Sequence, residues 1–108
     1  MNHKVLSNLG MAMRAGKLAT GEEIVHRCIR DGKAKLVLIA TDTAPGTRKK
    51  VLDKCATYGV DYAVALDRVS IGQAIGKAER VLVAVTDQGF AAMIQKQLSQ
   101  LPEVENID

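Results

Sequence analysis

The apolar residues of this chain alternate between helical spacing, in which they recur every three or four positions, and short runs without polar interruption. Helical spacing predicts five helices, and glycines near their ends mark where several of them stop. The predicted helices are residues 4–15, the segment from Thr20 to Gly32, the segment from Thr47 to Gly59, residues 70–76 and residues 87–101.

Apolar runs between the predicted helices indicate strands. Residues 36–40 and 81–86 are apolar without alternation, which is typical of strands buried on both faces. Residues 61–66 predict a third strand, and residues 17–19 a brief fourth one. Because strands and helices alternate, the sequence predicts an α/β fold, a three-layer α/β/α sandwich with a small mixed four-stranded sheet.

The length and composition of the chain are those of one globular domain. It has 108 residues, of which 47% are hydrophobic and 25% charged. We expect a single domain over residues 1–101, followed by a short acidic tail over residues 102–108 that frays. No apolar run approaches the ~18 residues that a membrane helix needs, so we expect a cytoplasmic protein without a membrane partner.

The cysteines and histidines predict neither a metal nor a cofactor. Cys28 and Cys55 are too far apart for a Cys-x-x-Cys site, and they fall on the apolar faces of predicted helices. We expect both to be reduced core thiols. His3 and His26 have no Cys, His or carboxylate at ligand spacing, and we expect both side chains to be solvated.

Positive charge is concentrated in the first part of the chain. The formal net charge is +3, but residues 1–60 carry 11 Lys and Arg against 5 Asp and Glu, whereas residues 61–108 carry 4 against 7. This imbalance favours a surface that faces a polyanion. The run Arg48-Lys49-Lys50 opens a predicted helix, where the helix dipole makes each cation unfavourable by ~0.3–1 kcal/mol. With Lys54 on the same side it is a candidate for phosphate contacts, and the alternative is a solvated surface.

The second predicted helix begins with a Thr-x-x-Glu sequence, the pattern of a capping box. We expect the Glu23 N–H to donate to the Thr20 hydroxyl, and the Thr20 N–H to donate to the Glu23 carboxylate. The spacing predicts an inner face made by Ile24, Val25, Cys28 and Ile29, and an exposed face made by His26, Arg27 and Arg30.

A second basic element is the segment Gly76-Lys77-Ala78-Glu79-Arg80, which lies between the short fourth helix and the last strand. Gly72 and Gly76 weaken that helix. They serve either close packing and a helix cap, or a loop that meets a partner, and both interpretations stay open.

The order and types of residues from Leu9 to Ile94 resemble a known family. The blocks that carry the resemblance are Gly16-Lys17-Leu18, Gly21, the segment from Ile29 to Ala40, Ile71-Gly72-Gln73-Ala74-Ile75-Gly76 and Val81-Leu82-Val83-Ala84-Val85. At this spacing they resemble the ribosomal proteins L7Ae and L30e, and most closely the small bacterial branch of that family. The resemblance covers about four-fifths of the chain.

The resemblance implies a non-enzymatic α/β/α sandwich that binds structured RNA, either rRNA or another noncoding RNA, typically at a kink-turn. In such proteins the start of the second helix enters the RNA groove, and the loop before the last strand covers a flipped-out nucleotide. Carried over by position, Gly21 permits close backbone approach, Glu22 and Glu23 occupy the base-reading turn, and Arg27 occupies the basic position one turn later. The implied RNA-binding residues are Lys17, Thr20, Gly21, Glu22, Glu23, Arg27, Lys33, Arg48, Gly76, Lys77, Ala78, Glu79 and Arg80.

Packing of the predicted layers should gather these residues. We expect Lys17, Arg27 and Lys33 around the start or the end of the second helix. We expect Arg48, Lys77 and Arg80 at the same edge.

One departure from the family pattern falls in the base-reading turn. Kink-turn readers commonly have Gly-Thr-Asn-Glu, whereas this chain has Gly21-Glu22-Glu23-Ile24. An Asn both donates and accepts hydrogen bonds, but an ionised Glu only accepts them. This leaves open whether the protein reads a kink-turn, captures a bent duplex by its shape and backbone, or is a protein-docking module of the same fold on the ribosome or the RNA-processing machinery.

Other classes of function receive less support. The few aromatic residues do not make a stacking platform for single strands, although charge alone does not separate RNA from DNA. Residues 45–50 lack the frame of a phosphate-binding loop. Asp42 and Asp87 follow buried strands, but a turn and a helix N-cap account for them. We expect a non-enzymatic monomer whose partners are structured RNA and ribosomal proteins, with no small-molecule substrate.

Overall fold

The computed structural model describes residues 3–101, and side chains from Lys4 onward. Within this range the helices are α1 (His3–Arg14), α2 (Glu22–Arg30), α3 (Pro45–Tyr58), α4 (Arg68–Ala74) and α5 (Gln88–Leu98). The strands are β1 (Leu18–Thr20), β2 (Leu36–Ile39), β3 (Tyr62–Val64) and β4 (Leu82–Val85). The expectations for the His3 side chain and for the tail 102–108 lie outside the described residues.

The strands form one four-stranded sheet in the order β1-β4-β2-β3. β2 and β3 are parallel, whereas β4 is antiparallel to both β1 and β2, so the predicted mixed sheet is confirmed. β2 and β4 occupy its centre, and all their residues are buried. Their uninterrupted apolar sequences therefore reflect a strand covered on both faces.

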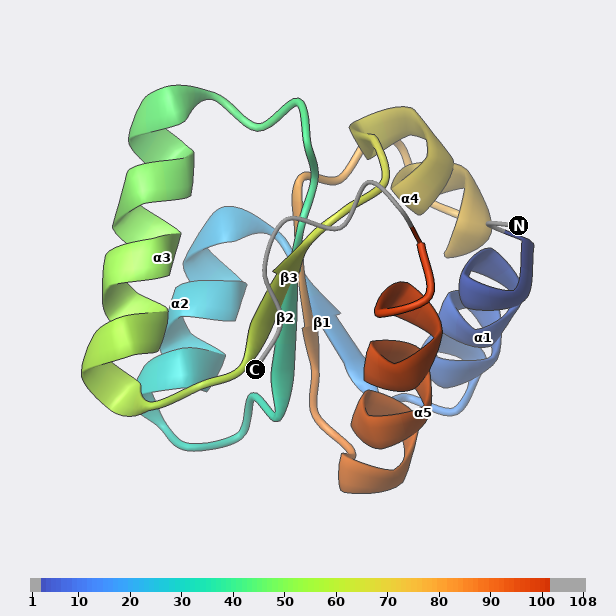
Figure 1. Ribbon diagram of the computed structural model, residues 1–108, viewed down its shortest axis with the longest axis horizontal. Helices are drawn as coiled ribbons and strands as arrows, with labels where there is room; N and C mark the ends of the chain where they lie inside the picture. The colour runs from blue at the N-terminus through green and yellow to red at the C-terminus, as the bar shows by residue number, and fades with distance from the viewer. Residues whose placement is uncertain (1–2, 102–108) are drawn as a thin grey trace.

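Two helical layers enclose the sheet, as Figure 1 shows, which confirms the predicted three-layer sandwich. α2 and α3 cover one face, above a core cluster that includes Val25, Ile29 and Val51. α1, α4 and α5 cover the other face, above a larger cluster that includes Leu9 and Ile94. No helix within residues 3–101 is long and apolar enough to cross a membrane.

Several predicted details of the helices are wrong. α3 begins at Pro45 after Ala44, two residues before the predicted start at Thr47, because proline suits the first helical position. Ile24, expected in the core, is 47% exposed. The inner face of α2 is centred on Val25 and Ile29, one turn apart, and Ile24 falls beyond its margin. Helical spacing in the sequence also predicts that Ala56 of α3 and Met93 of α5 are buried, but both are exposed.

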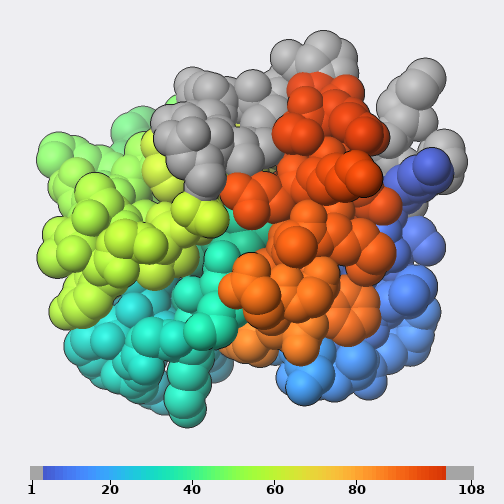
Figure 2. Space-filling view, turned by 60° about the horizontal axis from the view of Figure 1, so that its bottom comes forward, coloured from blue at the N-terminus to red at the C-terminus, as the bar shows by residue number. Residues whose placement is uncertain are grey.

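The two ends of β4 define the two ends of the molecule. Ala40 and Gly21 donate backbone hydrogen bonds near its start, to Val81 (2.9 Å) and Leu82 (3.4 Å). We call the surrounding segments 20–23, 41–48, 66–70 and 76–80 the β4-entry end. The β4-exit end comprises segments 15–18, 31–35, 58–61 and 86–88. Figure 2 brings the β4-exit end forward, with the light-blue chain that leads into β1 and the teal chain that leads into β2 beside the orange start of α5.

Candidate nucleic-acid interface

The turn from β1 into α2 depends on Gly21. Its φ of 100° and ψ of 146° lie where a residue with a side chain is strained. An added Cβ would meet no atom within 4 Å, so the backbone angles, and not crowding, require glycine here within the described chain. The Gly21 carbonyl accepts the first hydrogen bond of α2 from Val25 N–H, at 2.9 Å. The turn therefore leaves the start of α2 projecting at the β4-entry end.

The predicted capping box does not form. Thr20 is still part of β1, paired with Val83, and Gly21 is the N-cap residue of α2 without a side-chain cap. The sheet register holds Thr20 one position too early to cap, and its hydroxyl accepts a hydrogen bond from Arg80 Nε at 3.4 Å. Glu22 and Glu23 are both exposed. Their carboxylates are therefore available to a ligand at the first turn of α2.

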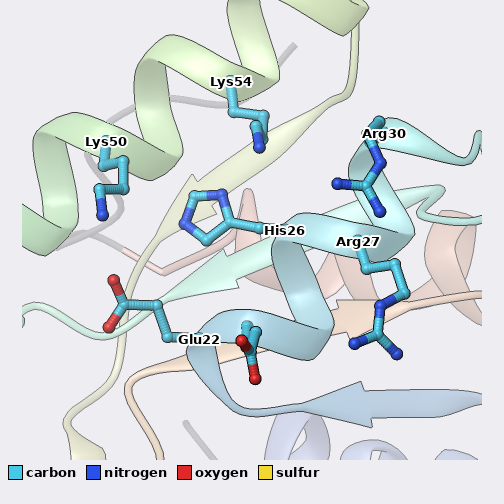
Figure 3. Close-up of a pocket in the computed structure, with 7 residues that line it drawn as sticks. Glu22, His26, Arg27, Arg30, Lys50 and Lys54 are labelled. Atoms are coloured by element: carbon cyan, nitrogen blue, oxygen red, sulfur yellow. The ribbon is translucent and has the colours of Figure 1, made fainter.

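An open groove of about 520 Å³ runs between α2 and α3 from this first turn. Figure 3 shows its side chains, which are Glu22, Glu23, His26, Arg27, Arg30, Lys50 and Lys54. The basic run therefore divides: Lys50 lines the groove together with Lys54, whereas Lys49 pairs with Asp53 at 3.0 Å on the outer side of α3. Arg30 also lies 3.5 Å from the Asp31 carboxylate.

His26 contradicts the expectation of a solvated side chain. It is partly buried, and both ring nitrogens are enclosed without a hydrogen-bond partner within the described chain. Burial lowers the pKa of His26 below its usual value, the positive charges of Lys54 and Lys50 lower it further, and Glu22 opposes them. These effects favour the neutral imidazole at pH 7.

The loop over residues 76–80 is held closely against α4. Gly76, at φ 72°, ends the helix, and Lys77 N–H donates to the Gly72 carbonyl at 2.9 Å. A Cβ on Gly72 would lie 2.3 Å from the carbonyl oxygen of Ala78. Gly72 therefore serves close packing, which was one of the two interpretations of the sequence, and this packing fixes the exposed loop residues Lys77, Ala78 and Glu79.

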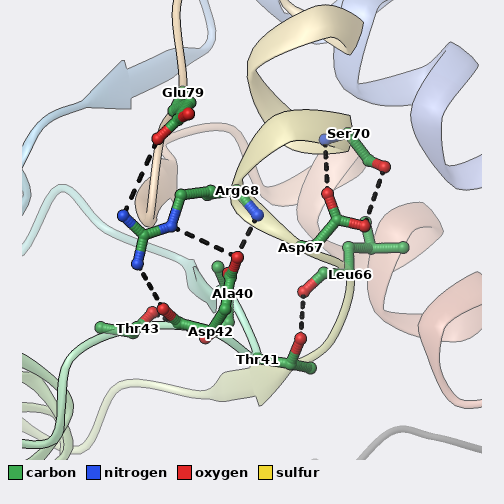
Figure 4. A network of polar contacts seen from close by, with 9 residues as sticks. All are labelled: Ala40, Thr41, Asp42, Thr43, Leu66, Asp67, Arg68, Ser70 and Glu79. Atoms are coloured by element: carbon green, nitrogen blue, oxygen red, sulfur yellow. Dashed lines mark hydrogen bonds and ion pairs between the residues drawn. The ribbon is translucent and has the colours of Figure 1, made fainter.

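Arg68 ties three segments of the β4-entry end together (Figure 4). Its backbone N–H and Nε donate to the two carboxylate oxygens of Asp42 at 3.0 and 3.3 Å, and its guanidinium also donates to the Asp42 carbonyl. The same guanidinium lies 3.8 Å from Glu79, and the Arg68 carbonyl accepts from Arg80 N–H at 3.2 Å. Asp42 thus has a structural role in a turn, as the sequence indicated.

Arg80 joins the loop to β1. Its guanidinium donates to the carbonyls of Ala78 and Glu79 at 3.3 and 2.9 Å, in addition to the Thr20 hydroxyl. This side chain therefore fixes the loop beside the β1–α2 turn, and its donors are partly engaged within the protein.

The structure collects most, but not all, of the residues that the sequence singled out. Those at or next to the β4-entry end are Thr20, Gly21, Glu22, Glu23, Arg27, Arg48, Gly76, Lys77, Ala78, Glu79 and Arg80. Lys17 and Lys33 lie at the β4-exit end: the Lys17 carbonyl accepts from Thr86 N–H at 2.9 Å, and Lys33 precedes Lys35, whose N–H donates to the Val85 carbonyl. The sequence singled out Lys50 and Lys54 as candidates for phosphate contacts, but it did not place them beside His26 and Arg30, because that convergence requires the packing of α2 on α3.

No group of three or more His, Cys, Asp or Glu residues within the described range is arranged to hold a metal ion. Cys28 and Cys55 are free thiols. Asp87 caps α5, because its carboxylate accepts from Phe90 N–H at 2.9 Å. Both acids that follow the central strands therefore have structural partners.

These features define a class of α/β/α sandwich in which a mixed sheet presents a helix start and a glycine-packed loop side by side at one end. A solved structure from Bacillus halodurans, of a protein described as having unknown function, shares this fold with a TM-score of 0.87 and 41% identity, over 90% of this chain and 98% of that one. A Giardia lamblia 15.5kD RNA binding protein shares the fold alone, with a TM-score of 0.74 and 21% identity over 86% and 82% of the two chains.

The chain belongs to the Ribosomal protein L7Ae/L30e/S12e/Gadd45 family, whose model matches residues 3–95. It is 52% identical to the RNA-binding protein YlxQ of Bacillus subtilis, over 77% of this chain and 83% of that protein. It is 36% identical to the large ribosomal subunit protein eL30 of Spodoptera frugiperda, over 90% and 84% of the two chains. The family that the sequence resembled is therefore confirmed.

Proposed function

We propose that this protein binds structured RNA at its β4-entry end and catalyses no reaction. The observation that carries the proposal is the contact between the β1–α2 turn and loop 76–80. Arg80 donates to Thr20, and Gly21 donates to Leu82. The β1–α2 turn and loop 76–80 therefore form one continuous surface in a family whose relatives include a protein named for RNA binding.

The proposed mechanism is capture of a bent RNA by its shape. The first turn of α2 enters a widened groove, and loop 76–80 covers an unstacked nucleotide beside it. Glu22 and Glu23 accept hydrogen bonds from base amino groups, because a carboxylate carries no donor of its own. Arg27, one turn further along α2, contacts a backbone phosphate.

The packing of loop 76–80 reduces the entropic cost of binding RNA in this way. Gly72 and Arg68 hold the loop before any ligand arrives. A loop that is already ordered loses less conformational entropy on binding than a free one. The loop therefore acts as a fixed surface that selects an RNA already able to bend.

We further propose a kink-turn or a related bent duplex, in ribosomal or another noncoding RNA, as the target, and a cytoplasmic monomer as the active form. Because Glu23 lacks the donor amide of an asparagine, this turn can form fewer hydrogen bonds with sheared G·A pairs. Recognition therefore depends more on the shape of the backbone than on hydrogen bonds to those bases.

The test is a binding titration at several salt concentrations against a kink-turn RNA and against a matched duplex in which Watson–Crick pairs replace the G·A pairs. We expect tighter binding to the kink-turn RNA. Equal and steeply salt-dependent binding to both would leave backbone recognition without kink-turn specificity. Indifference to both RNAs would refute the proposal and favour a docking module for proteins.

Two substitutions locate the surface. Arg27→Ala and Lys77→Ala should each weaken binding and reduce the salt slope by about 1, as expected for the loss of a phosphate contact. Lys17→Ala and Lys33→Ala are matched controls, because they remove the same charge at the β4-exit end. Equal losses in both pairs would show that binding follows net charge and not this surface.

A further inference from the structure

The α2–α3 groove carries more positive charge than the fold requires. Arg27 and Arg30 line it from α2, and Lys50 and Lys54 line it from α3. In Figure 3 both lysines extend toward His26, whereas Arg27 turns away from α3. Within residues 3–101, one of these four cations forms an ion pair: Arg30 pairs with Asp31, and because both side chains are exposed the pair contributes little stability. The groove therefore gathers four cations from two helices against two carboxylates, Glu22 and Glu23, which lie at its mouth.

The enclosed imidazole in this groove is a second, independent feature. His26 leaves both ring nitrogens without a partner, although enclosed polar groups in proteins are nearly always hydrogen-bonded. The charged groups that face it are Glu22 on its own helix and Lys50 and Lys54 on α3. Burial is the main cause that lowers the pKa of His26, and the two lysines lower it further, so a negative ligand that neutralises the lysines would favour a proton on the imidazole.

We propose that the α2–α3 groove binds the phosphodiester backbone of an RNA stem that continues from the RNA held at the β4-entry end. This inference rests on the proposed function and extends it, since it assigns a second contact surface to His26, Arg30, Lys50 and Lys54. The stem enters past the first turn of α2 and follows the groove toward the end of that helix.

The spacing of the cations suits a chain of phosphates better than a single small anion. Arg27 and Arg30 are three residues apart and Lys50 and Lys54 are four apart, which corresponds to roughly 4.5 and 6 Å along their helices. The groove is open along its length, so it does not enclose a small ligand. Cations contributed by two helices along one open groove provide successive contacts for a backbone.

The acidic mouth of the groove sets the direction of the stem. Glu22 and Glu23 repel phosphates and accept hydrogen bonds from bases, whereas the four cations beyond them attract phosphates. Bases are therefore favoured at the start of α2 and backbone further along it. This division separates the element that reads the bend from the element that holds the stem.

The first experiment measures RNA affinity against salt for the wild type, for Lys50→Gln/Lys54→Gln and for the control Lys4→Gln/Lys96→Gln. The control removes the same charge from exposed positions on α1 and α5, which cover the other face of the sheet. We expect the groove variant to lose about 10-fold or more in affinity at 0.1 M salt and to show a salt slope smaller by about 2, since each phosphate contact contributes about 1. The control should lose much less.

The RNA itself supplies the second arm. Each stem that flanks the bend is shortened in turn, and one of the two truncations should weaken the wild type while removing the difference between the wild type and the groove variant. Selective binding of the bent RNA with equal losses in groove and control variants would overturn the groove proposal and leave the proposed function intact. Failure of the wild type to bind any structured RNA would overturn both.

Proton uptake gives a readout that separates the groove from the first turn of α2. We expect NMR titration to show a higher pKa for His26 in the wild-type complex than in the free protein, so that affinity rises as pH falls from 7 toward 5. The truncation that abolishes the affinity difference between the wild type and Lys50→Gln/Lys54→Gln should also abolish most of the increase in affinity at low pH. A His26 pKa that is the same with and without full-length RNA would overturn the proposal.

Discussion

Replacing Gly72 by alanine should destabilise the protein, although alanine normally favours a helix. The added Cβ would lie 2.3 Å from the Ala78 carbonyl oxygen and 2.8 Å from its carbonyl carbon. An ordinary contact needs about 3.4 Å, so backbone on one side must move by roughly 1 Å. Overpacking of this kind costs about 1–3 kcal/mol, and the gain in helix propensity offsets at most about 1 kcal/mol. We expect a net loss of about 1–2 kcal/mol.

Urea unfolding measures this loss, and Gly46→Ala provides the matched control. Gly46 lies in the first turn of α3, and an added Cβ there meets nothing within 4 Å in the described chain. The same substitution should therefore be neutral or stabilising by up to about 1 kcal/mol at this position. In thermal melts, Gly72→Ala should lower the Tm and Gly46→Ala should leave it unchanged or raise it, by about 4–8 °C for each kcal/mol.

The strain can also be relieved by displacement of the loop. Hydrogen exchange then separates the two outcomes, because Lys77 N–H donates to Gly72 and Arg80 N–H donates to Arg68. Displacement would speed exchange at both amides and lower RNA affinity with little change in the unfolding free energy. A Gly72→Ala protein with wild-type stability and wild-type protection of both amides would refute the packing explanation.

Two further predictions concern single side chains. Asp67 is the N-cap of α4, and its carboxylate accepts a hydrogen bond from Ser70 N–H at 2.7 Å, which lowers the pKa of Asp67. Asp67→Ala should therefore reduce the unfolding free energy by about 1 kcal/mol at pH 7. Because the folded pKa is the lower one, that difference should shrink as pH falls below about 4, and a constant difference in urea unfolding would contradict the cap. Burial raises the pKa of Cys55 to about 11, so its alkylation at pH 8, followed by mass spectrometry, should be about two orders of magnitude slower than that of an unfolded peptide, whereas equal rates would show that the thiol is accessible.

The sequence predicted the structure best where an element is buried on both faces. The apolar runs of β2 and β4 predicted central strands because both faces of these strands are buried. Local patterns were less reliable where the sheet competes with them. The Thr-x-x-Glu sequence predicted a capping box, but Thr20 pairs with Val83, and the sheet register decides its orientation.

In the candidate site too, some residues could be predicted from the sequence and others could not. Gly21 was found through a family resemblance, loop 76–80 through its basic residues and then the resemblance, and Gly72 through its position in a short helix. Arg68 had no local signal, because its partner Asp42 is 26 residues away in sequence. His26 was assigned to a solvated face because the face that α3 covers depends on helix packing. Convergence between distant segments is a property of the tertiary structure, and single-sequence periodicity does not encode it.

The central position of β4 also sets the order in which the proposed binding surface can be completed during synthesis. β4 is the last strand in the chain, yet it lies between β1 and β2, and it supplies the partner of Thr20 and the carbonyl that receives Gly21 N–H. A nascent chain that ends before β4 already carries the basic residues of α2 and α3, but it has no strand to join β1 to β2. The proposed binding surface is incomplete in such a chain, so the shape selectivity proposed for it would be acquired only with the last quarter of the polypeptide, which begins at β4.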